Sequence, residues 1–243
     1  MNAVLRWIAL LLFAFIALQL FFVGRIAAMI VIDPESTTFQ RSEAWRIARD
    51  KDQLRWRQRW VPYSQISDHL KRAVIASEDD SFVYHMGVDW DALEKARHRN
   101  SKAEEIAIKR AALAPSRNRP ARIVGGSTIT QQLAKNLLLS GERTLLRKGQ
   151  ELALALLLEQ MLGKQRILEI YLNNVEWGEG VFGAEAAAQH YYRKSANKLA
   201  PQEAARLAVM LPQPKRFEKT PGSGYIASRA STIVARMRGA ELP

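Results

Sequence analysis

The feature that most constrains this sequence is an apolar run near the N-terminus, from Trp7 to Gly24. Its 18 residues contain one polar side chain, Gln19. A helix of about this length is the shortest that spans the hydrocarbon core of a bilayer. A cleaved signal peptide is the alternative, but the run is longer than the apolar part of a signal peptide and no A-x-A-like site follows it. We therefore predict an uncleaved anchor over residues 1–32, whose orientation the flanking charges do not decide.

The balance of charges indicates an anionic partner. The 243 residues include 36 Lys and Arg against 24 Asp and Glu, a formal net charge of +12 at pH 7. Such an excess favours binding to nucleic acid, to a membrane surface or to a phosphate-bearing substrate. The chain has no cysteine, which excludes a disulfide scaffold, a zinc–cysteine site and a cysteine nucleophile.

Basic residues and tryptophans alternate after the anchor. Between Arg41 and Trp60 there are seven basic and three acidic residues, interleaved with three tryptophans. This segment is either a solvated helical face or a juxtamembrane segment that rests on anionic headgroups. The sequence thus predicts an anchor (1–32), a basic juxtamembrane segment (33–60) and a mainly helical domain (61–243), which we expect to fold without residues 1–32.

A carboxylate continues the apolar stripe of the first helix expected in this domain. Between residues 65 and 82, apolar residues recur every four positions, and Glu78 is the next member of that series. An inward position would raise the pKa of Glu78 and suit it to proton abstraction. The alternative is that Glu78 ends the helix, exposed or salt-bridged. Asp79 is rotated about 100° away, while Phe82 and His85 follow at spacings that could wall the same site.

A glycine turn precedes the next apolar helix. Gly125 and Gly126 are followed by Thr128 and Gln131, a pair that fits a capping box. One interpretation is purely structural: a turn, a cap and a helix. The other is a ligand wall, because glycines allow close approach of a ligand, free N–H groups attract anions, and Gln131 shares a helix face with Lys135.

A basic cluster precedes a helix that is apolar nearly all round, over residues 152–162. The cluster contains Arg143, Arg147, Lys148 and Glu151. It is either a set of i,i+3 and i,i+4 ion pairs at the mouth of a buried helix or a cationic pocket for a diphosphate. In the second case, Glu151 would orient the cations or hold a metal ion.

Two further segments are predicted to be helical at least in part. Residues 93–122 carry nine basic and three acidic residues, and we interpret them as a helix that gives way to a mobile loop. Residues 164–174 form an amphipathic pattern that turns Ile167, Leu168, Tyr171 and Leu172 inward.

Four motifs occur in order: EDDSFVYHMG at 78–87, GGSTITQQ at 125–132, RKGQE at 147–151 and RILEIYLN at 166–173. Together they resemble the motifs of the family 51 glycosyltransferases, the peptidoglycan glycosyltransferases. The resemblance extends from about Trp60 to Phe217. It implies a mainly α, lysozyme-like glycosyltransferase domain with an N-terminal transmembrane helix, a large head and a smaller membrane-facing jaw. With one anchor and no second domain, the chain resembles the monofunctional biosynthetic type.

The resemblance also implies roles for residues at the matching positions. Glu78 would be the general base on the 4-hydroxyl of the acceptor sugar, and Glu151 a second essential carboxylate. The donor's diphosphate would be held by Lys135, Arg143, Arg147 and Lys148. The cleft would be shaped by Asp79, Phe82, His85, Ser127, Thr128, Gln131, Gln132 and Asn136. The sequence requires no cofactor, although some family members use a divalent cation, Mg or Mn, near the diphosphate.

The implied activity is polymerisation of lipid II into β-1,4-linked glycan strands, with inversion at the anomeric carbon and release of undecaprenyl diphosphate. The implied partners are lipid II, the growing glycan chain, lipids of the cytoplasmic membrane and other cell-wall synthesis or division proteins, and no nucleic acid. A single span in the inner membrane would hold the catalytic domain on the periplasmic face.

The residues themselves are consistent with this chemistry. A diphosphate leaves readily once its charge is neutralised, so the reaction needs one base and several cations. A glycosidase instead needs two carboxyl groups that flank the scissile bond.

Three alternatives stay open at this point. A lysozyme-like lytic enzyme would share the fold, but it does not explain Lys135, Arg143 and Lys148. A non-catalytic membrane-anchored scaffold would carry charge without correctly spaced carboxylates. A transpeptidase would explain the S-x-x-K match at Ser195 and Lys198, but no S-D-N or K-T-G motif accompanies it.

Overall fold

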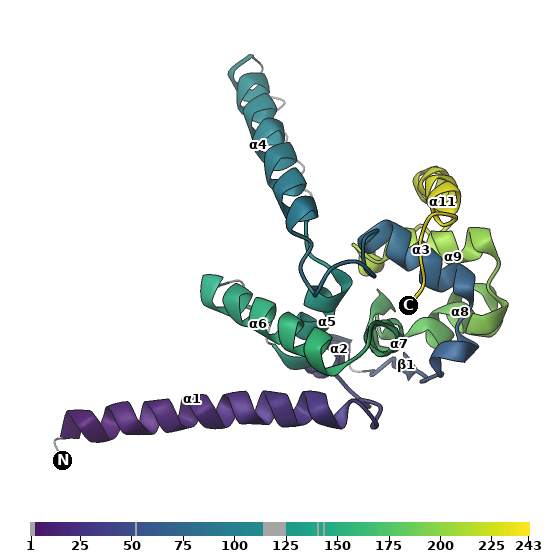
Figure 1. Cartoon of the computed structure of the whole chain (residues 1–243). Helices are drawn as coiled ribbons and strands as arrows, with labels where there is room; N and C mark the ends of the chain where they lie inside the picture. The colour runs from purple at the N-terminus through teal and green to yellow at the C-terminus, as the bar shows by residue number, and fades with distance from the viewer. Residues whose placement is uncertain (1–2, 52, 114–124, 140, 143) are drawn as a thin grey trace.

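The computed structural model describes residues 3–51, 53–113, 125–139, 141–142 and 144–243. The described residues are mainly helical, as the sequence predicts (Figure 1). The helices are α1 (Ala3–Ala28), α2 (Thr38–Lys51), α3 (Asp68–Glu78), α4 (Trp90–Leu113), α5 (Ile129–Leu138), α6 (Leu145–Met161), α7 (Lys164–Asn174), α8 (Ala184–Tyr192), α9 (Pro201–Met210), α10 (Pro214–Phe217) and α11 (Gly224–Arg236), with short 3-10 turns at Tyr63–Gln65 and Ala196–Lys198.

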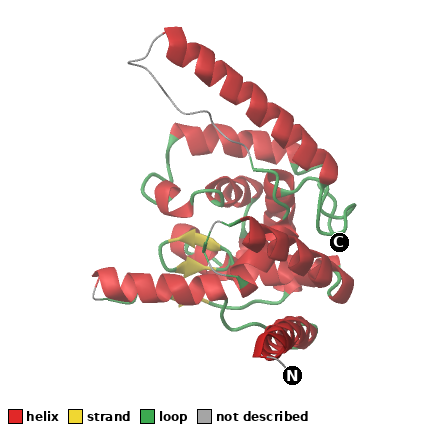
Figure 2. Cartoon of the chain, turned by 90° about the vertical axis from the view of Figure 1, so that its left-hand side faces the viewer, coloured by secondary structure: helices red, strands yellow, loops and turns green. Residues whose placement is uncertain are grey.

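A small sheet lies among the helices (Figure 2). Its strands are β1 (Arg57–Gln58), β2 (Glu176–Gly178) and β3 (Val181–Phe182), in the order β1-β3-β2. β1 pairs with β3 in parallel, with Gln58 opposite Phe182, and β2 pairs with β3 antiparallel. Because β1 precedes the helical domain in sequence, this pairing ties the segment after α2 to the centre of the fold.

α1 extends away from the rest of the chain (Figure 1). Among the described residues it is the one helix long and apolar enough to cross a membrane, with a mean hydropathy of 2.4 over its most apolar window. Its last two turns and the residue after them differ from the rest, because Phe22, Ile26 and Met29 are buried. α1 contacts α6. The end of the anchor is therefore part of the core.

Arg166 on α7 bonds the residues that follow α1. Its Nε donates to the carbonyl of Met29 over 2.9 Å and its Nη2 to the carbonyl of Ile32 over 3.2 Å. The same guanidinium pairs with Asp33 at 2.7 Å. These carbonyls lie just beyond the end of a helix and have no helical partner of their own, so an arginine is well suited to satisfy them.

Residues 33–60, predicted as a juxtamembrane segment outside the helical domain, pack against that domain. Thr38 Oγ1 on α2 donates to the carbonyl of Leu137, and Ile47 is buried. The ring of Trp56 stacks on Phe182 with 4.5 Å between centroids. Of the three tryptophans, Trp45 is the exposed one. α2 therefore has a short buried face, which includes Ile47, beside its exposed charged residues.

The helices of the core pack in two groups, and α7 contacts α5, α6 and α8. α3 packs against α9 and α11, while α5 packs against α6, α7 and α2. α4 projects from this body (Figures 1 and 2). It confirms the helix predicted at the start of residues 93–122, and it begins at Trp90 and ends at Leu113. The loop expected further along lies largely outside the described residues. The end of α3 and the start of α5 meet between these groups.

Candidate active site

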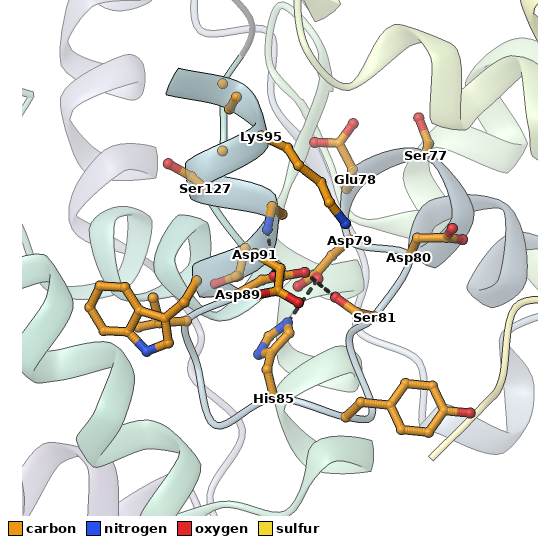
Figure 3. A pocket seen from close by; sticks show the side chains of 18 of the residues that line it. Ser77, Glu78, Asp79, Asp80, Ser81, His85, Asp89, Asp91, Lys95 and Ser127 are labelled. Atoms are coloured by element: carbon orange, nitrogen blue, oxygen red, sulfur yellow. Dashed lines mark hydrogen bonds and ion pairs between the residues drawn. The ribbon is translucent and has the colours of Figure 1, made fainter. Parts of the chain in front are cut away.

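A cleft of about 770 Å³ opens where α3 ends. Its walls come from the end of α3, the loop that leads to α4, the first turns of α4, and residues 125–128 before α5 (Figure 3). Glu78, Asp79, His85, Ser127 and Thr128 all line it. The first two predicted motifs therefore meet in one cavity.

Glu78 is the last residue of α3 and is partly buried in this wall. The apolar positions before it on the stripe, Leu70 and Val74, are fully buried, which confirms the inward direction predicted from the sequence. Burial raises the pKa of Glu78 above its ordinary value of 4.5, although hydrogen bonds from Gln132 and Ser77 and the charge of Lys135 act in the opposite direction. A carboxyl group with a raised pKa beside a cavity can take a proton from a bound hydroxyl.

Gln132 links Glu78 to a buried tyrosine. Its Nε2 donates to Glu78 Oε2 over 3.0 Å, and its Oε1 accepts from the hydroxyl of Tyr171 over 3.0 Å. Tyr171 lies on α7 and is 1% exposed. The sequence pattern predicts that Tyr171 points inward but predicts no partner for it. The available signal was a phenol among aliphatic inward positions, because a buried tyrosine hydroxyl usually finds a hydrogen-bond partner.

Asp79 holds the cleft loop to the start of α5. One carboxylate oxygen accepts from the backbone N–H of Ile129 over 2.9 Å, and the other lies 2.8 Å from Nε2 of His85. A carboxylate at a helix N-terminus also interacts favourably with the helix dipole. Asp79 therefore links two motifs through hydrogen bonds. Both of its oxygens are engaged in these contacts, so it does not share the role of Glu78.

The predicted capping box is present at the start of α5. Thr128 Oγ1 accepts from the N–H of Gln131, and Gln131 Oε1 accepts from the N–H of Thr128. Thr128 also donates to the carbonyl of Gly87 over 2.7 Å. Gln131 is buried and occupied with its own helix cap. The neighbouring Gln132, not Gln131, provides the contact with the candidate base.

A buried ion pair supports the cleft loop from beneath. Lys164 Nζ lies 2.8 Å from Glu159 Oε1, which also accepts from Thr130 Oγ1 over 2.6 Å. Lys164 donates in addition to the carbonyl of His85, and its ammonium lies 4.5 Å from the ring centre of Phe82. Sequence spacing does not predict this role for Glu159 and Lys164, because their partners come from α5 and from the loop after α3.

The basic cluster predicted at the start of α6 forms around a buried carboxylate. Glu151 Oε2 lies 2.8 Å from Arg147, and Glu151 Oε1 pairs with Lys148. Lys148 Nζ also lies 3.3 Å from Ser127 Oγ, a residue of the cleft wall. Both ion pairs expected from the spacing are thus present. The contact with Ser127 brings the cationic cluster to the border of the cleft that contains Glu78.

Known proteins resemble this chain in sequence over nearly its whole length. Residues 48–238 match the family described as Transglycosylase. The chain belongs to this transglycosylase family. It is 49% identical to a biosynthetic peptidoglycan transglycosylase of Paraburkholderia phytofirmans, with 98% of this chain and 94% of the relative covered. It is 50% identical to a protein of the same name from Burkholderia thailandensis, with 100% of this chain and 90% of the relative covered.

Five of the predicted site residues of the transglycosylase line the cleft itself: Glu78, Asp79, His85, Ser127 and Thr128. Phe82 is fully buried beneath His85, with 6.4 Å between ring centroids, so it supports the wall from the core rather than facing the cavity. Asn136 is half-buried on α5, and Lys135 is exposed on the same helix. Arg143 lies outside the described residues.

The cleft of the transglycosylase contains carboxylates, which are possible ligands of a cation. Among the described residues, no group of three or more His, Asp or Glu side chains is placed to hold a metal ion. Both oxygens of Glu151 are already paired with Arg147 and Lys148. The described residues therefore do not form a ready-made metal site.

Proposed function

We propose that this transglycosylase polymerises lipid II into β-1,4-linked glycan strands and releases undecaprenyl diphosphate, in the synthesis of the bacterial cell wall. The observation that carries the proposal is the pairing of two unlike groups at one cleft. A partly buried carboxyl, Glu78, lies in the wall, and the Arg147–Lys148–Glu151 cluster reaches the same wall through Ser127. One base and several cations are what this transfer requires.

In the proposed reaction, Glu78 accepts the proton of the acceptor sugar's 4-hydroxyl as that oxygen attacks the anomeric carbon of the donor. The bond from that carbon to the diphosphate oxygen breaks, and the centre inverts. Negative charge builds on the departing diphosphate, where Lys135, Arg147 and Lys148 would stabilise it more in the transition state than in the bound substrate. Arg143 would act with them.

Glu151 has a different proposed role. It is buried and accepts hydrogen bonds from both Arg147 and Lys148. It therefore fixes the direction in which these two cations point, and it offsets the repulsion between them before the substrate arrives. A carboxylate held in this way is a poor candidate for a second proton-transfer group, which favours transfer over hydrolysis by a pair of acids.

We further propose that α1 anchors the enzyme in the cytoplasmic membrane, with the cleft on the outer, periplasmic face. The length and hydropathy of α1 support a single span. Its buried end would hold the cleft at a fixed distance from a substrate that cannot leave the bilayer. We expect other cell-wall synthesis or division proteins as partners and no nucleic acid. No cofactor is required by the sequence, although a divalent cation, Mg or Mn, could bind near the diphosphate.

Incubation of the purified full chain with labelled lipid II in detergent tests the proposed function. Products would be separated by gel electrophoresis, and the same protein would be incubated with preformed glycan strands. We expect a ladder of lengthening strands from lipid II and no shortening of preformed strands. Shortening without synthesis would mean that the protein is a lytic enzyme, and no change in either sample would favour a scaffold.

A further inference from the structure

Three side chains from three helices form one hydrogen-bonded chain that ends at Glu78. Tyr171 comes from α7, Gln132 from α5 and Glu78 from α3, and each link is 3.0 Å long. We propose that Tyr171 is a positioning residue for the base, which it serves by fixing the orientation of the Gln132 side-chain amide. This inference rests on the proposed function, in which Glu78 takes a proton from the acceptor.

The two ends of the Gln132 amide offer opposite partners to Glu78. In the orientation present, the amide N–H donates to the carboxylate, as an ionised base requires. After a flip of the amide, the oxygen would face the carboxylate, and two acceptors would repel unless Glu78 carried a proton. Because both orientations occupy the same volume, packing alone does not choose between them.

Tyr171 makes that choice through its hydroxyl. Burial, together with the nearby charges of Glu78 and Asp79, raises the pKa of Tyr171 well above 10.0, so the phenol keeps its proton at any working pH. Its O–H donates to Gln132 Oε1 and holds the amide with its N–H toward Glu78. Tyr171 thereby favours the ionised form of Glu78 and opposes the burial that favours the protonated form.

Other groups around Glu78 also influence its titration. Asp79 raises its pKa, while Lys135 and a hydrogen bond from Ser77 lower it. The remaining charged or titratable groups that line the cleft are Asp80, Tyr84, His85, Asp89, Asp91, Lys95, Arg99 and Arg236. Because a Tyr171→Phe substitution leaves all of these in place, its effect reports on the Tyr171–Gln132 link.

The test is the pH dependence of kcat/KM for lipid II polymerisation by the full chain in detergent. Loss of a hydrogen bond that favours the ionised carboxylate should move the acidic limb of the Tyr171→Phe profile upward by about one pH unit. Tyr191→Phe is the matched control. Tyr191 is half-buried, and its hydroxyl also donates to a protein acceptor, the carbonyl of Trp177, over 2.7 Å. Its profile should coincide with that of the wild type.

A second pair of variants separates positioning from a general structural effect. Gln132→Met removes the amide that transmits the effect, and it should shift the acidic limb at least as far as Tyr171→Phe does. Adding Tyr171→Phe to Gln132→Met should then shift the limb no further, because Tyr171 acts only through Gln132. Thermal unfolding of each variant monitors the fold.

The outcomes are distinct. An unshifted limb in Tyr171→Phe, or an additional shift in the double variant, would overturn the inference. If Tyr171→Phe does not fold, an unshifted limb in Gln132→Met would overturn it equally. A wild-type chain that makes no glycan would instead contradict the proposed function, so the two failures are distinguishable.

Discussion

Lys148 Nζ lies 3.3 Å from Ser127 Oγ, so the basic end of α6 reaches the glycine turn that forms part of the cleft wall. The two residues belong to motifs that are about twenty positions apart in sequence, and no local pattern predicts that they touch. Through this contact Lys148, which is also paired with Glu151, borders the space where a diphosphate would leave.

The first prediction concerns Lys148. Lys148→Met keeps most of the side-chain length but removes the charge, and we expect kcat to fall by about 100-fold or more while KM changes by less than about 3-fold. The reason is that charge accumulates on the leaving oxygen in the transition state. Steady-state kinetics with lipid II in detergent measures this, with Arg229→Met as the control, because Arg229 is exposed on α11. Equal losses in both variants would indicate a collective effect of basic charge.

The second prediction concerns Glu151, which is buried and paired with two cations. Glu151→Gln leaves Arg147, which is mostly buried, without its ionic partner, and breaking such a pair costs about 3 kcal/mol. We expect both a lower midpoint of thermal unfolding and a loss of polymerisation. A variant that melts like the wild type would show that Glu151 does not stabilise the start of α6.

The third prediction concerns stability around Glu78. Since burial raises the pKa of Glu78 in the folded state above 4.5, the unfolded state loses this proton first as pH increases. The free energy of unfolding of the wild type should therefore fall as pH rises from 4.5 through the folded-state pKa. Glu78→Gln lacks this term, so it should melt at a higher temperature than the wild type at neutral pH, and the difference should disappear below pH 4.5. A lower melting temperature at neutral pH would contradict a buried, destabilised carboxylate.

Sequence patterns predicted the local parts of the site well. The four-residue stripe that leads to Glu78, the capping box at Thr128 and the ion pairs of Glu151 all depend on spacing within one helix. The general fold class was also accessible, because an apolar run and several amphipathic helices leave few architectures open.

The remaining features depend on how helices pack, which spacing does not determine. Gln131 and Gln132 are adjacent and chemically identical, and only the position of α3 and α7 relative to α5 gives Gln132 the contact with Glu78. Phe82 lies in the core because the loop after α3 folds back over Lys164. α2 packs through Phe39 against Phe182, which is remote in sequence, with 6.3 Å between ring centroids.

The fourth prediction concerns the anchor. A deletion of residues 1–20 leaves Phe22, Ile26 and Met29, which are buried in the core, whereas a deletion of residues 1–32 removes them. Each such side chain contributes about 1.5–3 kcal/mol when buried. The longer deletion also removes two carbonyls bonded by Arg166. We therefore expect the shorter deletion to melt near the full chain in detergent and the longer one to melt several degrees lower.

Both deletions should polymerise lipid II more slowly on bilayers than in detergent, relative to the full chain, because they lose the span that concentrates enzyme and substrate in one membrane. Identical melting temperatures for the two deletions would mean that the end of α1 adds nothing to the core. Thermal unfolding and polymerisation on vesicles measure the two effects separately.

The central claim is that Glu78 is the base of a glycan-polymerising reaction, and the most direct measurement compares Glu78→Gln with Glu105→Gln in the lipid II assay. Glu105 is an exposed carboxylate on α4 whose ion pair with Lys109 contributes little to stability. We predict that Glu105→Gln makes glycan strands at the wild-type rate, while Glu78→Gln stays folded and polymerises about 100- to 10,000-fold more slowly. A folded Glu78→Gln variant that retains more than about half of the wild-type rate would contradict this assignment.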